Sequence, residues 1–207
     1  MVEMYNNGGP FMHPILGCLI FGLAMSLYKI WSLFMASINT RKFLIRIKKA
    51  LAEGGVEAAT KLCENTRGPV AAIFHSGLLR ANRGLEHVEK AIMNAGTIEM
   101  AFLERGLLWL STVSTVAPML GFLGTVSGMI SAFQDIAAAN DISPAIVATG
   151  ISEALLTTMF GLIVGIIIQT THNFFVSKVD RLVIDMEESS VDLVDSLIDL
   201  DVDAKQA

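Results

Sequence analysis

An uncharged run of 28 residues, from Gly106 to Phe133, is the feature that most restricts what this chain can fold into. A helix of that length rises about 42 Å at ~1.5 Å per residue, more than the roughly 30 Å hydrocarbon core of a bilayer. A helix in water needs charged side chains along its exposed face. The run therefore predicts a membrane-spanning helix that is tilted or bends at Pro118.

The distribution of basic residues predicts two further spans and an orientation. Lys and Arg are absent from residues 1–28 and 106–177, whereas eleven of them lie between Arg41 and Arg105. Because Lys and Arg are retained on the cytoplasmic side, three spans with the N-terminus outside and the C-terminus inside satisfy every flank. The expected fold class is an all-α membrane protein with three transmembrane helices, extended by long cytoplasmic helices and oriented N-out/C-in.

Local signals set the expected boundaries. Gly54-Gly55 and Gly68-Pro69 divide the basic block into short helices, and Pro144 suits the first turn of a third span with Ser143 as its N-cap. The expected segments are an outer N-terminus (1–10), transmembrane helix 1 (11–38), a cytoplasmic helical domain (39–105), transmembrane helix 2 (106–135), an outer loop (136–143), transmembrane helix 3 (144–177) and a cytoplasmic C-terminal helix (178–207).

Several function classes are not expected. The basic block contains seven acidic residues, and its aromatic residues are only three phenylalanines, so nucleic-acid binding is not predicted. The four histidines have no metal-ligand spacing, so we expect no metal site. The sequence has neither a nucleophile elbow nor a P-loop. We therefore predict no enzyme, no catalytic residue and no cofactor.

Glu153 is the one Asp, Glu, Lys or Arg residue between Asp141 and Lys178. If the third helix begins at Pro144, Glu153 lies roughly 13 Å along it, inside the hydrocarbon. A carboxylate there costs several kcal/mol unless it faces water, a partner or a proton. The alternative is that the helix begins later and Glu153 lies at the membrane interface.

Two stripes of small and polar residues recur at helical spacing, one in each of the last two spans. The first includes Thr125 and the second includes Glu153 with Thr157 and Thr158. Such stripes can line a shared ion pathway. They can equally be packing faces, because Gly124 with Gly128 and Gly161 with Gly165 form two GxxxG motifs that allow close backbone approach.

Two longer motifs resemble a known family. They are VAPMLGFLGTVSGMISAF, from Val116 to Phe133, and ISEALLTTMFGLIVGI, from Ile151 to Ile166. Their order and spacing are similar to those of the ExbB/TolQ/MotA proton-channel family, most like ExbB or TolQ. The match is strong over roughly residues 103–178 and only architectural elsewhere.

The resemblance implies an assembly and a site. It implies a homo-oligomer, expected to be a pentamer, around two copies of an ExbD/TolR-like single-span protein with an intramembrane Asp. Carried over by motif, Thr125, Glu153 and Thr158 are the expected pore-lining residues, with Thr157 a further candidate. The coupling ion is expected to be H⁺, and Na⁺ stays open because hydroxyls beside a carboxylate suit either ion.

The resemblance also implies a role in a bacterial inner membrane, where the outer loop and N-terminus would be periplasmic. The expected function is the ring-forming subunit of a molecular motor driven by the proton motive force. Through a TonB-like protein it would energise TonB-dependent transport across the outer membrane. The alternatives are a TolQ-like subunit for envelope maintenance and a passive membrane scaffold. Membrane lipids are expected around the spans.

Overall fold

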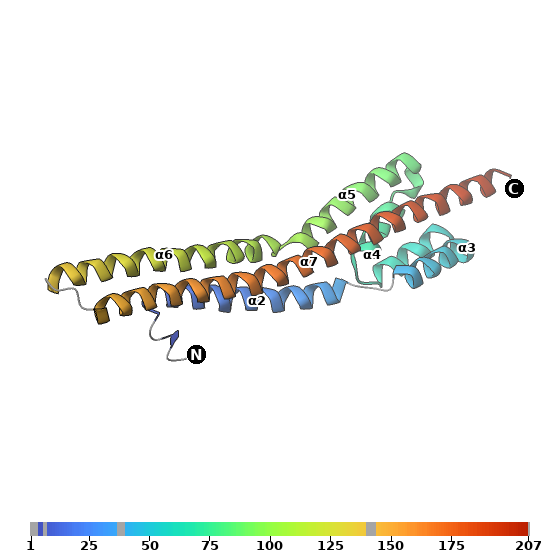
Figure 1. Ribbon diagram of the computed structural model, residues 1–207. Coiled ribbons are helices and arrows are strands. Elements are labelled where there is room, and N and C mark those ends of the chain that lie inside the picture. The colour runs from blue at the N-terminus through green and yellow to red at the C-terminus, as the bar shows by residue number, and fades with distance from the viewer. Residues whose placement is uncertain (1–3, 6–7, 37–39, 140–143, 207) are drawn as a thin grey trace. The chain divides into compact units, whose positions relative to one another are not determined.

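The computed structural model of the chain describes residues 4–5, 8–36, 40–139 and 144–206. Within these residues every regular element is a helix (Figure 1). The elements are α2 (Met12–Ala36), α3 (Thr40–Glu64), α4 (Pro69–Leu78), the short 3₁₀ helix η1 (Ala81–Arg83), α5 (Leu85–Glu104), α6 (Leu107–Ala139) and α7 (Pro144–Gln206).

The chain divides into two compact units. The span unit comprises Met1–Lys29 and Gly106–Phe175, and the helical domain comprises Ile30–Arg105 and Val176–Ala207. Two helices, α2 and α7, contribute to both units. Each unit is described by itself below.

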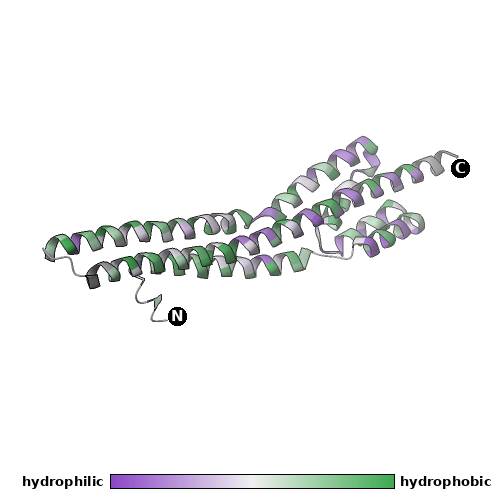
Figure 2. Ribbon diagram, in the orientation of Figure 1, coloured by the Kyte–Doolittle hydropathy of each residue, from purple (hydrophilic) through white to green (hydrophobic). Residues whose placement is uncertain are grey.

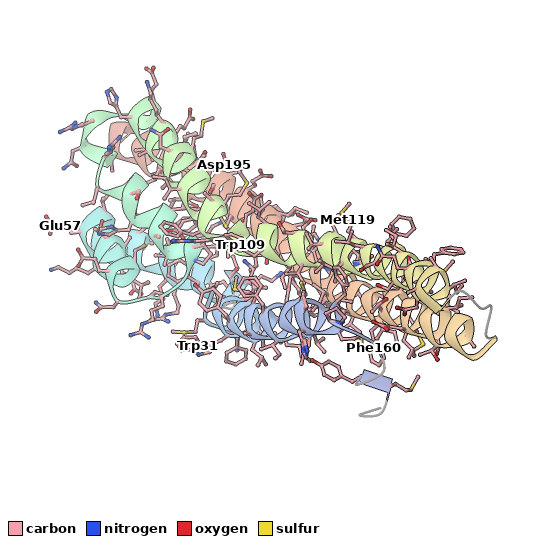
Figure 3. All side chains as sticks on the ribbon, turned by 90° about the vertical axis from the view of Figure 1, so that its left-hand side faces the viewer. Trp31, Glu57, Trp109, Met119, Phe160 and Asp195 are labelled. Carbon is pink, nitrogen blue, oxygen red and sulfur yellow. The ribbon has the colours of Figure 1, made fainter. Side chains whose placement is uncertain are left out.

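The span unit exposes its large apolar side chains. Leu27 and Phe122 are each 68% exposed, and Ile166 is 65% exposed. Figure 2 shows α6 and the first half of α7 as predominantly hydrophobic. Figure 3 shows Met119 on the outside of the helices, pointing away from them. The described residues contain three helices long and apolar enough to cross a membrane, which confirms the expected all-α class with three candidate spans. The N-out/C-in orientation stays a prediction.

The end of α6 differs from the expected boundary. The outer loop was predicted to begin at residue 136, but α6 continues to Ala139. Residues 137–139 are all Ala, the residue with the highest helix propensity, so the helix extends by one more turn. The remaining loop residues 140–143, the predicted N-cap Ser143 among them, lie outside the described residues, as do residues 37–39 after the first span.

The helical domain is packed as a protein in water is packed. Phe43 of α3 and Phe74 of α4 stack with ring centroids 5.7 Å apart, and both are buried. The final part of α7 buries Val179, Met186 and Leu193. Lys48 of α3 and Asp192 of α7 form an exposed ion pair of 3.4 Å. The expected break at Gly54-Gly55 appears as a kink within α3, where Gly55 has φ 64° and ψ −163°.

Candidate functional site

The two small-residue stripes meet directly, in a contact that we call the α6–α7 seam. A Cβ added at Gly161 would lie 2.7 Å from the carbonyl oxygen of Ala117 and 3.0 Å from the Cα of Gly121. One helical turn away, a Cβ at Gly124 would lie 2.6 Å from Oγ1 of Thr157. The backbones of α6 and α7 therefore approach as closely as glycine allows, and packed atoms fill the seam at these levels.

The other two glycines of the GxxxG motifs also lie in the seam, at either end of it. A Cβ at Gly128 would lie 3.1 Å from Cβ of Ala154, and one at Gly165 would lie 2.6 Å from Cγ of Pro118. Residue 118 of α6 thus contacts residue 165 of α7, and residue 128 of α6 contacts residue 154 of α7. The two helices are antiparallel.

The hydroxyl groups of the seam donate to backbone carbonyls. Thr157, only 2% exposed, donates to the carbonyl of Ala154 at 2.7 Å. Thr158 donates across the seam to the carbonyl of Gly121 at 3.0 Å, and Thr125 donates to the carbonyl of Phe122 at 2.6 Å. Each hydroxyl has one proton and two lone pairs, so each oxygen keeps the capacity to accept a hydrogen bond or to bind a cation.

Helical geometry separates Glu153 from Thr158. Thr158 follows Glu153 by five residues, which is about 140° around a helix with 3.6 residues per turn. Thr125 follows Gly121 by four residues and Thr158 follows Ala154 by four, so each lies about 40° beyond the seam in the direction of its own chain. Because α6 and α7 are antiparallel, these equal rotations bring Thr125 and Thr158 to the same side of the seam. We call this side the threonine edge.

Glu153 lies on the opposite side, which α2 covers. A Cβ added at Gly22 of α2 would lie 2.6 Å from Cδ1 of Ile168 and 3.3 Å from Cγ1 of Val113. Phe21 of α2 and Trp109 of α6 make an edge-to-face contact with ring centroids 6.1 Å apart. We call this side the α2 edge.

The carboxylate of Glu153 contacts the segment that precedes α2. A Cβ added at Gly9 would overlap Oε1 of Glu153 and would lie 2.7 Å from its Cδ. Gly9 has φ 68°, a left-handed conformation that favours glycine. The side chain of Glu153 is partly exposed.

The structure thus distributes the predicted site residues over two edges and the seam between them. It brings Thr157 and Thr158 together with Gly121 and Gly124, and it places Glu153 against Gly9. One chain does not gather Thr125, Glu153 and Thr158 into one cluster, and their assignment to an ion pathway stays a prediction.

Sequence reasoning did not single out Gly9. The Gly8-Gly9-Pro10 run signals an unusual backbone turn. It carries no sign that its contact would be a carboxylate 144 residues further along the chain.

Known proteins are similar to this chain. An ExbB homolog of Methanothermobacter thermautotrophicus, described as a biopolymer transport protein, is 32% identical over 87% of this chain and 64% of its own length. The biopolymer transport protein ExbB of Xanthomonas campestris pv. campestris is 41% identical over 48% of this chain and 39% of its own length. The Tol-Pal system protein TolQ of Pseudomonas aeruginosa is 34% identical over 48% of this chain and 43% of its own length. This chain therefore matches less than two thirds of each of these relatives.

A family match covers more than half of the chain. Residues 65–188 match the MotA/TolQ/ExbB proton channel family. This stretch includes α4, α5, α6 and the part of α7 that carries Glu153 and the hydroxyl groups. The chain is a membrane protein with transmembrane helices, and it belongs to the MotA/TolQ/ExbB proton channel family.

Proposed function

We propose that this chain is the ring-forming subunit of an inner-membrane motor driven by the proton motive force. In the ExbB-like form of this proposal, the motor energises TonB-dependent transport across the outer membrane. A TolQ-like role in envelope maintenance is the alternative form. The spans would be oriented with the N-terminus in the periplasm and the helical domain in the cytoplasm, following the basic residues of the helical domain.

The position of Glu153 is the observation that carries the proposal. α7 begins at Pro144, so Glu153 lies nine residues, or roughly 13 Å, into a helix whose next charged side chain is Lys178. An ionisable group at that depth is expensive in lipid and is typical of proton and ion pathways. An early helix start at Pro144 argues against the alternative that Glu153 lies at the interface.

The separation of the two edges supports an oligomer. A single chain cannot line one path with both Glu153 and Thr158, because they lie on opposite sides of the seam. Several chains around a common axis can direct their threonine edges toward one central space. A ring of this kind, which we take to be a pentamer, uses Thr125 and Thr158 of every chain and places no ion in the filled seam.

A partner helix is needed in that central space. We propose two copies of an ExbD/TolR-like single-span protein, each with one intramembrane Asp. When protonated, such an Asp can donate a hydrogen bond to the lone pairs of Thr125 or Thr158, whose own protons are held by backbone carbonyls. H⁺ is the proposed coupling ion, and the same oxygens are suited to Na⁺.

Replacing Glu153 tests the proposal. In cells that depend on this chain for TonB-dependent uptake, Glu153→Ala should abolish uptake while the protein is still made and still assembles. The matched control is Ser152→Ala, an exposed neighbour on α7 that should keep wild-type uptake. Full uptake in a well-assembled Glu153→Ala variant would refute the motor.

A passive scaffold is the second candidate, and the filled seam favours it. If the stripes serve only packing, Thr125→Val and Thr158→Val should leave uptake unchanged, because both variants keep the volume of the side chain. If the motor proposal holds, each should lower uptake severalfold at unchanged protein level. The mass of the intact complex in mild detergent then separates the two readings further: five copies with two of a single-span partner support the motor, and an oligomer that never binds such a partner supports the scaffold.

A further inference from the structure

We propose that the Gly8-Gly9-Pro10 segment positions the carboxylate of Glu153 and covers it at this end of the span, with Gly9 as the positioning residue. The inference rests on the proposed function only in giving Glu153 an ion to exchange. The contact itself is a property of the fold.

A side chain at position 9 would have to push the carboxylate of Glu153 out of its present position. Even a methyl group on Gly9 would overlap Oε1 of Glu153. The backbone of Gly9, with φ 68°, also adopts a conformation that L side chains rarely adopt. The backbone conformation of Gly9 therefore favours glycine, and a side chain there would also displace the carboxylate of Glu153.

Neighbouring residues hold the segment in place. The backbone N–H of Gly8 donates to the carbonyl of Tyr5 at 3.2 Å. The Tyr5 hydroxyl and Nδ1 of His13 share a hydrogen bond of 2.6 Å, which links the segment to the first turn of α2. Met12 follows the segment and is 2% exposed.

Tyr5, which precedes the segment, also lies near α7. Tyr5 lines an apolar groove of about 360 Å³ together with Ile15 of α2 and with Phe160 and Val164 of α7. Glu153, Phe160 and Val164 are spaced by seven and four residues, so they lie on one face of α7. Tyr5 therefore lies beside the same face of α7 that carries Glu153.

This arrangement gives the segment a definite effect on proton exchange. The backbone at Gly9 lies directly against the carboxylate of Glu153, which is otherwise partly exposed. A proton that reaches the carboxylate from the side of Gly9 must pass this backbone. Contact with this backbone also limits the positions open to the carboxylate, which preorganises it for that transfer.

Carbodiimide modification of Glu153 tests the cover directly. Membranes containing the full-length protein are treated with a water-soluble carbodiimide and an amine, and the modified fraction at position 153 is followed by mass spectrometry. Gly9→Ala should speed modification roughly tenfold. The added methyl group strains the backbone and overlaps the carboxylate, so the segment spends more time displaced from Glu153. Tyr5→Phe, which removes only the hydrogen bond to His13, should speed modification about threefold.

Two glycine controls separate the contact from general effects. Gly17→Ala adds a methyl group in open space on α2, and Gly55→Ala adds one at a similar positive φ in open space within α3. In both variants the carbodiimide should modify Glu153 at the wild-type rate. A wild-type rate in Gly9→Ala and in Tyr5→Phe would overturn the proposal, and if Gly9→Ala is not produced, a wild-type rate in Tyr5→Phe alone would do so.

A shorter carboxylate tests positioning separately from folding. Glu153→Asp withdraws the carboxylate by one methylene, so Gly9→Ala should have at most a small further effect on modification and on uptake in that background. An equal effect of Gly9→Ala in both backgrounds would show that Gly9 acts only through the fold and would refute the positioning role. Failure of the motor proposal can be told apart from both outcomes. Uptake by cells with Glu153→Ala tests the motor, whereas the rate at which Glu153 is modified in the Gly9→Ala variant tests whether the segment covers the carboxylate.

Discussion

The span unit and the helical domain are packed by opposite means, although one helix, α7, runs through both. In the span unit, α7 contacts α6 through Gly150, Ala154, Thr157, Gly161 and Gly165, and bulky side chains such as Ile166 face outward. In the helical domain, α7 buries Val179, Met186 and Leu193 and exposes its carboxylates.

The difference reflects the solvent of each unit. Water drives large apolar side chains into a core, because their burial removes apolar surface from water. Lipid offers no such gain, so helices associate through close van der Waals contact and interhelical hydrogen bonds, which small residues permit. The size of the residues on the contact face of α7 therefore indicates which solvent surrounds each part of the helix.

The reactivity of Cys63 gives the largest expected contrast. Burial in the helical domain raises the pKa of the Cys63 thiol to about 12 from an ordinary value of 9.0. The thiolate is the reactive form, so at pH 8 we expect alkylation by iodoacetamide to be about a thousandfold slower than at an exposed thiol. The comparison is with Asn65→Cys in a Cys63→Ala background, since Asn65 is exposed. Equal rates would show that this core is open to water.

The same thiol makes stability depend on pH in a known direction. The pKa of the Cys63 thiol is higher in the folded state than in the unfolded state, so the thiol of the unfolded chain loses its proton first as pH rises. The contribution to stability is complete below about pH 9 and is lost as pH rises toward about 12. Cys63→Ala should flatten the decline in unfolding temperature over that range.

Replacing an aromatic residue with Ala should lower the free energy of unfolding by very different amounts in the two units. Phe74 is fully buried in the helical domain, so Phe74→Ala should lower the free energy of unfolding by about 3–5 kcal/mol. Phe122 is 68% exposed in the span unit and is expected to face lipid, where its loss opens no cavity. Thermal unfolding in detergent measures both variants, and similar losses would contradict the division of the chain between water and lipid.

Enlarging a seam glycine should destabilise the span unit. Gly161→Val would press a side chain against the backbone of Ala117 and Gly121, at an expected cost of about 1–3 kcal/mol. Gly17→Val, which enters open space on α2, is the matched control. The fraction of protein that remains monodisperse in mild detergent after heating checks the difference, which should disappear if the seam is loosely packed.

Removing the hydrogen bond across the seam should have the smallest effect on stability. Thr158→Val keeps the shape but loses the bond to the carbonyl of Gly121, and such bonds within membranes average about 0.6 kcal/mol. Thr158→Ser retains the hydroxyl and is the control. A loss of several kcal/mol on heating in detergent would mean that polar contacts, and not close packing, hold α6 to α7.

Much of the fold could be predicted from the sequence because it depends on local signals. The 28-residue uncharged run and the two other apolar stretches predict three long helices, which the structure contains. Pro144 stands where α7 begins, and Gly55 lies where α3 kinks. The second span was predicted to end at residue 135, whereas α6 continues to Ala139 because the three alanines at residues 137–139 favour a helix.

The candidate site was predicted less completely, because its arrangement depends on rotation about the helix axes. Periodicity placed Thr125, Glu153, Thr157 and Thr158 on stripes, and a stripe is too broad to separate Glu153 from Thr158. The contact between Gly9 and Glu153 joins residues far apart in the sequence, and no local pattern indicates it.

The sequence by itself therefore determined the class of the protein: a membrane protein with three apolar helices, a basic helical domain and the motifs of its family. These properties follow from composition and helical period, which are local. Only the tertiary structure decided that the stripes close on each other, that Glu153 and the threonine edge lie on opposite sides of the seam, and that Gly9 contacts the carboxylate. Such features depend on which helix faces pack together, and that choice is made by contacts between distant parts of the chain.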